Sequence, residues 1–534
     1  MDRNELIRFC KGPQEKTISI KFILLLSIFS YMAANTLILF LHGVFWDDWC
    51  MYENVDGIRE ITNGIGAKWQ YPMHIFLLDL AHTFNVDVVL IYRVIVYLIG
   101  IINVVLFCQV LNNFKFSNGF ILWSTLIFSV WPLGYSHMLL CCFQYQPGVL
   151  FQLFALVFLP RFLEKRQGFL YILIFVFQFI ASLFLQSTIV LWFGVLCLSS
   201  VYITHDKYSL SWKYLGIIIH QFISLSYLFI PCLIYWVLRL FFWMPSGYYA
   251  MNSYNEVSVV HIIKAPILIL SSLLDSLCSI LVIAVHITSA IPYAIFFILL
   301  SVVIYLCMIR RNTNYSISKN SQILYCFSIL YCFCIGAYVL VGKVQTHDSV
   351  NDRNGILLPL SVVPMIVALL SYVRHVVLHR LFLSGIYSLL MMGTLFQYIE
   401  MLEASQKNDA IIEFFSHNTL QEGNIRVEDV TSHADLTPFY SWSGMYKKAT
   451  KKQDHCFSDD KGNIYDTGWF LSSMYNQRDA TVGDPNQTII ISGKPSVKDV
   501  LVSFVFGLLN EKKYKEAITC MYNIKIYKNN YGLQ

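Results

Sequence analysis

The stretch FILLLSIFSYMAANTLILFL, residues 22–41, runs directly into HGVFWDDWCMYE, residues 42–53. The first part is an uncharged apolar run of about 20 residues, the length that a helix needs to cross a bilayer. The second part places two adjacent carboxylates among tryptophans just beyond that helix. Residues 1–21 are rich in Lys and Arg, and no small-residue cleavage site follows the apolar run. We therefore expect an uncleaved first helix with a cytoplasmic N-terminus.

Apolar runs dominate most of the chain. Its 534 residues are 56% hydrophobic and 13% charged, and the mean hydropathy is +0.56. A soluble protein of this size exposes far more polar side chain. The sequence predicts an all-α polytopic membrane bundle with about 11 spanning helices. The expected spans are 22–41, 87–110, 120–136, 148–160, 169–186, 187–204, 214–238, 289–309, 322–341, 356–373 and 381–397. The run 257–287 is interpreted as a helix at the outer interface.

The positions of the basic residues predict the topology. Alternate connectors carry most of the lysines and arginines, which places them in the cytosol with the N-terminus. An odd number of spans sends the remainder of the chain to the opposite side, where its composition is that of a soluble α/β domain. A strand is expected at 487–492 and a helix at 496–510. The expected parts are a cytoplasmic segment 1–21, a membrane domain 22–397 with a first outer loop 43–86, and an extracytoplasmic domain 398–534.

Charge and cysteine content indicate no further class of protein. The net charge of +5 gives no sign of nucleic-acid binding, and the partner that the composition indicates is the lipid bilayer. The 14 cysteines include no CxxC pair and no Cys/His cluster at metal-ligand spacing, so most are interpreted as small apolar residues. Cys456 and Cys520 lie in the C-terminal region, where an oxidising compartment would allow a disulfide.

Asp47 and Asp48 are the strongest candidates for chemistry. Adjacent acids repel each other, so one of them should have a raised pKa near neutrality, as a general base needs. Neighbouring side chains point apart on a helix or strand, so we expect one carboxylate to react while the other orients a substrate or a divalent cation. The alternative is an acidic, solvated loop on the non-cytoplasmic side. The flanking Trp46 and Trp49 favour a binding role, because an exposed Trp at a membrane surface needs a partner.

The motifs resemble those of a known family. FWDDWCMY at 45–52, NGIGAKWQYP at 63–72 and HDSVNDRNGILLPL at 347–360 are similar to loops of the GT-C superfamily of membrane glycosyltransferases. Within it the chain looks most like the bacterial and phage O-antigen glucosyltransferases that change serotype. In that pattern a Gly-Arg-Trp-like segment follows the acidic pair, whereas this chain has Ala67-Lys68-Trp69. Lysine keeps the charge but lacks the two-pronged guanidinium.

The resemblance implies a reaction and a place for it. It implies inverting transfer of a hexose, with glucose as the expected sugar, from a polyprenyl phosphate to a lipid-linked or polymeric O-antigen-like glycan. The expected place is the periplasmic face of a bacterial inner membrane, with a flippase and a donor-synthesising enzyme as partners. Asp47 or Asp48 would act as the base or bind a Mg²⁺ or Mn²⁺ ion. Arg353 and Lys68 would balance the charge of the leaving phosphate. The alternatives for Arg353 are an anchor at the membrane interface and an ion pair with Asp352.

Further binding residues are expected from their positions and side-chain types. Lys264 flanks an outer loop and is a second candidate for phosphate, with interface anchoring as the alternative. Aromatic faces stack on sugars, and polar side chains bond to hydroxyl groups. The remaining candidates of this kind are Trp46, Trp49, Glu53, Trp69, Tyr71, Tyr145, Tyr248 and His347.

Three other functions remain open on the sequence. A lipid-linked polysaccharide polymerase or ligase would depend on basic and His residues more than on an acidic pair, and would not consume a single-sugar donor. A lipid or glycan transporter would show internal pseudo-symmetry and charges in broken helices, and no repeat is evident. A eukaryotic mannosyltransferase of the endoplasmic reticulum would share the first-loop chemistry.

Overall fold

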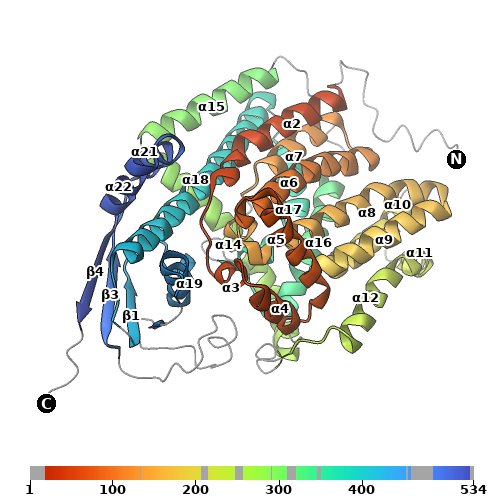
Figure 1. Ribbon diagram of the computed structural model, residues 1–534. Coiled ribbons are helices and arrows are strands. Elements are labelled where there is room, and N and C mark those ends of the chain that lie inside the picture. The colour runs from red at the N-terminus through yellow and green to blue at the C-terminus, as the bar shows by residue number, and fades with distance from the viewer. Residues whose placement is uncertain are drawn as a thin grey trace.

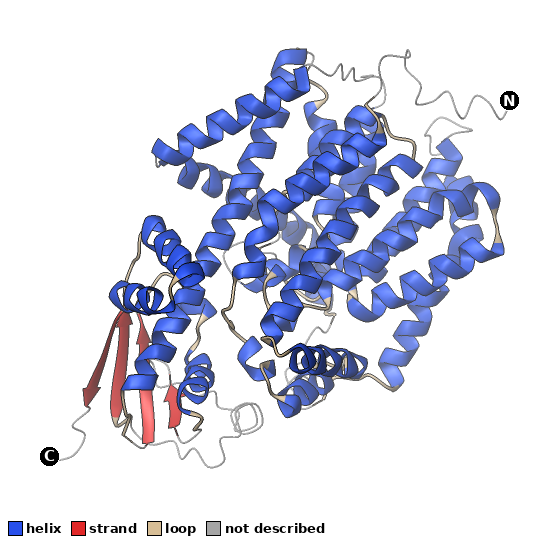
Figure 2. Cartoon of the chain, turned by 45° about the horizontal axis from the view of Figure 1, so that its top comes forward, coloured by secondary structure: helices blue, strands red, loops and turns tan. Residues whose placement is uncertain are grey.

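The computed structural model describes residues 18–528, apart from Leu133, 206–214, 247–249, 251–256, Ala290, 310–319, 345–349, Arg374, Glu422, 453–454 and 459–484. A large bundle of helices occupies most of the molecule, and a small sheet with its own helices lies at one end (Figure 1, Figure 2). The expected all-α bundle with a C-terminal α/β part is therefore the architecture of the described chain.

The bundle is formed by successive helices that are joined by short connections. Its α-helices are α2 (Ile20–Asn35), α3 (Asp48–Met51), α4 (Val55–Gly64), α5 (Tyr71–Phe84), α6 (Val88–Asn113), α7 (Asn118–Ser129), α8 (Tyr145–Lys165), α9 (Gly168–Phe184), α10 (Ser187–His205), α11 (Leu215–Leu225), α12 (Ile230–Phe241), α14 (Val259–Ser289), α15 (Ile291–Ile309), α16 (Asn320–Leu340), α17 (Pro359–Leu370) and α18 (Val376–His417). Short 3₁₀ helices are η1 (Thr36–Phe40), η2 (Lys68–Gln70), η3 (Tyr135–His137), η4 (Leu140–Cys142), η6 (Ser226–Phe229), η8 (Val350–Gly355) and η9 (Ala434–Leu436).

Seven helical segments among the described residues are long and apolar enough to cross a membrane. They are Ile20–Phe40, Val88–Asn113, Leu140–Lys165, Ile219–Phe241, Val259–Ser276, Ile323–Leu340 and Val376–His417. Exposed aliphatic side chains support a lipid-facing role: on α14, Val259 is 72% and Ile263 is 73% exposed, which water would disfavour. The protein is thus a helical membrane protein, and the count of eleven spans stays a prediction.

Several expected spans are shorter than predicted. The runs at 120–136 and 356–373 form helices of only 12 residues, α7 and α17, which extend about 18 Å. Helix α7 ends where Pro132 and Gly134 follow, because Pro cannot continue the hydrogen-bond ladder and Gly134 has a φ of 74°. The run expected to lie at the interface, 257–287, corresponds to the 31-residue helix α14, and part of it also meets the length and composition required for a span.

Helix α18 continues well beyond the expected end of the last span at 397. It has 42 residues, so it is about 63 Å long, roughly twice the thickness of a bilayer core. The sequence beyond 397, YIEMLEASQKNDAIIEFFSH, contains neither Gly nor Pro, so nothing breaks the helix there. The expected boundary at 398 therefore falls inside one continuous helix, which runs from the bundle to the sheet (Figure 1).

The C-terminal part is a four-stranded mixed sheet covered by helices. The strand order is β2-β1-β3-β4, with β1 parallel to β2 and β3, and β3 antiparallel to β4. The strands are β1 (Gly423–Asp429), β2 (His455–Ser458), β3 (Gln487–Ser492) and β4 (Asn523–Lys528), and the helices are α19 (Phe439–Thr450), α21 (Val497–Leu509) and α22 (Glu511–Met521). The strand and helix predicted at 487–492 and 496–510 are confirmed. A Ser496–Asp499 capping box begins α21, as such a Ser-x-x-acid pattern favours.

The buried apolar residues form two clusters, and the second joins the two parts of the molecule. One cluster lies inside the helical bundle. The other extends from Tyr31 and Phe45 at the end of the first helix, through Trp49, to Trp442 and Ile489 of the C-terminal part. The first outer loop is therefore packed between the bundle and the sheet.

Candidate functional site

A buried arginine shapes the chain where it leaves the first helix. Arg93 lies on α6, is 1% exposed, and donates hydrogen bonds to the carbonyl oxygens of Leu41 and Gly43. Its guanidinium also lies 5.8 Å from the centre of the Phe45 ring. A charge at this depth is expected to face the protein interior, and Arg93 does so. It fixes the direction in which the acidic loop begins.

Asp48 is completely buried at the start of α3. Its Oδ1 accepts a hydrogen bond of 2.9 Å from the backbone N–H of Cys141, whereas its Oδ2 is buried without a hydrogen-bond partner. Burial raises the pKa of Asp48 to about 6, and the N–H groups and Arg93 partly oppose that rise. The raised pKa expected for one acid of the pair is present, but desolvation is its main cause, where the sequence suggested repulsion between the acids.

Asp47 and Trp46 are more accessible than Asp48. Both are half-buried. Trp46 has a φ of 46°, and its backbone N–H donates a 3.0 Å hydrogen bond to the carbonyl of Leu436. The two acids thus lie in different environments, one inside the protein and one at its surface. Of the two side chains, only that of Asp47 is partly accessible from outside the protein.

Arg353 lies in η8, far from the first outer loop in the sequence, yet it contacts that loop. Its guanidinium carbon lies 5.1 Å from the centre of the Trp46 ring, within the range of a cation–π interaction. The structure therefore brings together Trp46, which directly precedes the acidic pair, and the arginine that the sequence proposes for phosphate.

Lys343 is a cation at this site that the sequence reasoning did not select. It follows α16 and is half-buried. Burial, together with the nearby charge of Arg353, lowers the pKa of Lys343 to about 8. Two neighbouring cations at a partly dehydrated position are stabilised by an anion. The sequence offers only one sign of this role: Lys343 is one of several basic residues in the loops that are predicted to lie outside the cytosol.

The sequence suggests only one role for Asp352, an ion pair with the adjacent Arg353. In the structure it is 3% exposed, and its carboxylate accepts hydrogen bonds from the backbone N–H groups of Tyr135 and Ser136. Burial raises the pKa of Asp352 to about 7, and these hydrogen bonds and Arg353 oppose the rise. This contact joins η3 to η8, the segment that carries Arg353. No motif in the sequence indicates it, because the two segments are more than 200 positions apart.

Three predicted binding residues of the first loop have other contacts. Trp49 is 5% exposed, and its ring packs against Tyr52 and beside Gly444 of α19, so it joins the core that links the loop to the C-terminal part. Tyr71 accepts a hydrogen bond from Arg59. Trp69 packs edge-on against Phe184, with 4.9 Å between the ring centres.

The other predicted residues are dispersed. Glu53 and Lys68 are exposed, Lys264 is exposed near the start of α14, and Tyr145 is half-buried at the start of α8. No contact among the described residues joins Lys264 to the acidic pair. Tyr248, His347 and the adjacent loop residues lie outside the described part of the chain. The roles of all these residues stay predictions.

The donor groups around Asp47 and Asp48 decide whether a metal ion could bind there. Within the described residues, no group of three or more His, Cys, Asp or Glu side chains is placed to hold a metal ion. One oxygen of Asp48 is already bonded to Cys141. Asp47 and Asp48 thus supply at most a partial coordination shell.

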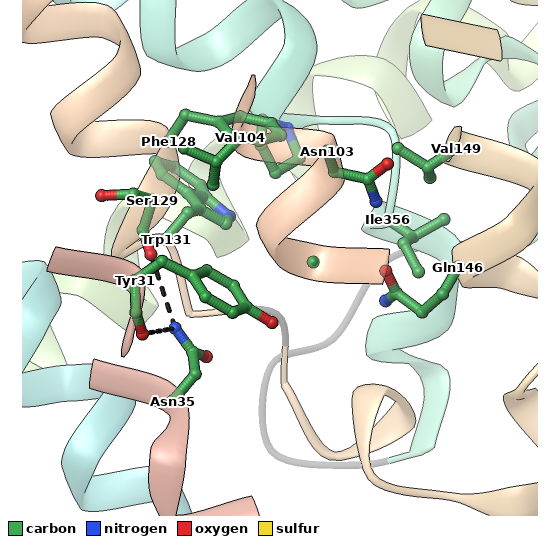
Figure 3. Close-up of a pocket in the computed structure, with 12 residues that line it drawn as sticks. Tyr31, Asn35, Asn103, Val104, Phe128, Ser129, Trp131, Gln146, Val149 and Ile356 are labelled. Atoms are coloured by element: carbon green, nitrogen blue, oxygen red, sulfur yellow. Dashed lines mark hydrogen bonds between the residues drawn. The ribbon is translucent and has the colours of Figure 1, made fainter. Parts of the chain in front are cut away.

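A small pocket lies in the bundle, lined by residues of α2, α6, α7, α8 and α17 (Figure 3). Its volume is about 30 Å³, enough for about two water molecules and too small for a sugar. Asn35 donates hydrogen bonds to the carbonyls of Tyr31 and Ser129 (Figure 3). The Tyr31 hydroxyl and the Asn103 Oδ1 are buried without hydrogen-bond partners, which suits bridging water.

Comparison with known proteins leaves the family open. No protein-family model matches the chain, and no curated protein matches it significantly.

Proposed function

We propose that the chain is an inverting glycosyltransferase that uses a polyprenyl-phosphate hexose, with glucose as the expected sugar. Its acceptor would be a lipid-linked or polymeric O-antigen-like glycan at the periplasmic face of a bacterial inner membrane. Three features support this proposal: the membrane bundle, the acidic pair just beyond the first helix, and the resemblance of the motifs to GT-C enzymes.

The observation that carries the proposal is the contact between Arg353 and Trp46. Their loops are far apart in the sequence, yet the guanidinium lies 5.1 Å from the indole centre. Asp47 follows Trp46 directly, so a base and a phosphate-binding cation belong to the same small region. Sugar transfer from a phosphate needs both groups. The acceptor hydroxyl must lose a proton on one side of the reacting carbon, and the phosphate leaves as an anion on the other.

Asp47 is the base in the proposed mechanism. Its carboxylate takes the proton of an acceptor hydroxyl, and the hydroxyl oxygen attacks the anomeric carbon of the donor. The bond from that carbon to the phosphate oxygen breaks, and the phosphate leaves with the electron pair. A single displacement of this kind inverts the configuration. Arg353 and Lys343 balance the charge on the departing phosphate.

Asp48 and Trp46 support these groups. Asp48 holds the turn at the start of α3 against the backbone of Cys141, which fixes the position of its neighbour Asp47. Trp46 presents its ring to Arg353 and so keeps the cation near the acid. The C-terminal part contacts the same loop through Lys448, whose ammonium lies 5.0 Å from the Tyr52 ring centre. We propose that the C-terminal part binds the acceptor glycan.

The test is sugar transfer by the purified protein in liposomes. The wild type should transfer glucose from polyprenyl-phosphate glucose to a lipid-linked glycan and release polyprenyl phosphate. The double variant Asp47→Asn/Asp48→Asn should insert normally and lose transfer, while Asp79→Asn, at an exposed position on α5, should retain it. Full activity of the double variant would refute the catalytic role. Uptake of an unchanged glycan would favour a transporter instead.

The expected topology has its own test. Glu53→Cys places a thiol at an exposed position in the first outer loop, and Lys115→Cys places one at the opposite end of α6. In intact cells an impermeant maleimide should label the first variant and not the second, compared with the wild-type background. Labelling of the second variant alone would place the acidic pair in the cytosol, where no extracytoplasmic donor could reach it.

A further inference from the structure

We infer that Asp352 is a positioning residue: by binding the backbone of Tyr135 and Ser136, it holds the neighbouring Arg353 over Trp46. This inference rests on the proposed function, because it assigns Arg353 to the donor phosphate. It adds a part that neither the motifs nor the resemblance indicates.

Both carboxylate oxygens of Asp352 accept hydrogen bonds from the loop that contains η3. Ser136 N–H lies 3.1 Å from one oxygen and 3.4 Å from the other, and Tyr135 N–H donates to the second oxygen. Hydrogen bonds from N–H groups to an ionised acid are stronger than those between neutral groups. With 3% of its surface exposed, Asp352 cannot reach a substrate, so its role must be exerted through another residue.

The loop on the other side of this contact is shaped to receive the carboxylate. Gly134 has a φ of 74°, which residues with a side chain rarely adopt. A Cβ atom at this position would overlap the Asp352 carboxylate. Glycine is therefore needed both for the backbone conformation and for the close approach of the acid.

The receiving loop is itself held in place by two further contacts. The Tyr135 hydroxyl donates a 3.0 Å hydrogen bond to Glu400 of α18. His137 and Gln146 of α8 are joined by a 2.8 Å hydrogen bond. Asp352 is thus bonded to a segment that is tied to two long helices.

The residue after Arg353 is also anchored. Asn354 is 3% exposed and donates a 3.2 Å hydrogen bond to the carbonyl of Val344. The half-buried Arg353 therefore lies between two buried, bonded neighbours. This arrangement limits the positions that its guanidinium can take and keeps it at Trp46.

The experiment measures binding of geranylgeranyl phosphate, a short polyprenyl phosphate without a sugar, to the full-length protein in detergent. Tryptophan fluorescence can report it, and thermal unfolding is recorded for every variant. Arg353→Ala should weaken binding at least tenfold, and Asp352→Asn should weaken it by a similar factor. The double variant Asp352→Asn/Arg353→Ala should bind within twofold of Arg353→Ala, because the acid acts through the arginine. Asp79→Asn is the control.

Gly134→Ala breaks the same contact from the other side without removing a charge. It should weaken binding like Asp352→Asn, and again only when Arg353 is present, so it replaces Asp352→Asn if that variant does not fold. Wild-type binding by Asp352→Asn, or equal losses with and without Arg353, would overturn the positioning role. If Arg353→Ala binds normally, the phosphate assignment fails as well. If binding behaves as expected but no sugar is transferred, only the proposed reaction fails.

Discussion

The substitution Asp48→Asn should change the pH dependence of stability in a direction that the structure fixes. Asp48 has no exposed surface, and burial raises its pKa from 3.8 to about 6. Between these two values the folded protein holds the proton more tightly than the unfolded chain does. The wild type is therefore stabilised as the pH falls from 7 toward 4, and the full cost of the buried charge is present above pH 6.

The magnitude follows from the same pKa values. Each pKa unit corresponds to about 1.4 kcal/mol, so ionised Asp48 costs roughly 3 kcal/mol of folding free energy at pH 7.5. At pH 4.5 about 1 kcal/mol of this cost remains. Asparagine has the same shape, can still accept from Cys141 and does not titrate. The stability of Asp48→Asn relative to wild type should therefore rise by about 2 kcal/mol from pH 4.5 to pH 7.5, whatever constant cost the buried amide adds.

Thermal unfolding in detergent at both pH values measures this difference, which amounts to a few degrees in the apparent midpoint. Asp79→Asn should give the same difference from wild type at both pH values, because that side chain is exposed. A constant difference for Asp48→Asn across the pH range would refute the reasoning, since it would mean that Asp48 is not titrating between 3.8 and 6.

Three further predictions can be tested with the same preparation. Asp47→Asn should reduce sugar transfer at least a thousandfold with little change in donor binding, because only the base is lost; steady-state kinetics decide it, and a large rise in donor KM alone would contradict it. Arg353→Lys should retain part of the wild-type affinity for the donor, because the charge remains but the planar fork does not. Equal binding by the lysine and alanine variants would oppose a phosphate role for Arg353. Asp429→Asn should destabilise the protein by about 3–5 kcal/mol, since it leaves the buried Lys407 without its acid partner at 2.9 Å; an unchanged melting profile would contradict it.

The sequence predicts well those features that depend on local composition. Apolar runs identify the long helices, and the β-branched run Thr488–Ile491 identifies β3 at 487–492. The lengths of α7 and α18 were mispredicted for a physical reason. Hydropathy does not register the turn that Pro132 and Gly134 impose, nor the helix-forming polar residues that extend α18 beyond 397.

The candidate site was predicted in part. The side-chain chemistry of Asp47 and Arg353 could be read from short motifs, and the structure places the loops that carry them together. The contact between Asp352 and the backbone of Tyr135 and Ser136 could not be predicted, because almost every residue has a backbone N–H group and no side-chain pattern marks the ones that are used. The burial of Trp49 was also hidden, since it depends on packing against Gly444 from a distant helix.

The continuity of α18 sets the distance of the C-terminal sheet from the helical bundle. Within the bundle, Tyr387 and Tyr398 on this helix bond to Ser30 and Asn35 of α2 at 2.8 and 2.9 Å, and beyond it Asn408 bonds to the carbonyl of Val44 at 2.8 Å. These bonds fix α18 both to the bundle and to the segment that follows the first helix. Adding one residue to it between positions 399 and 407 would raise the sheet by about 1.5 Å and turn it by about 100°, which would separate it from the loop that it now covers.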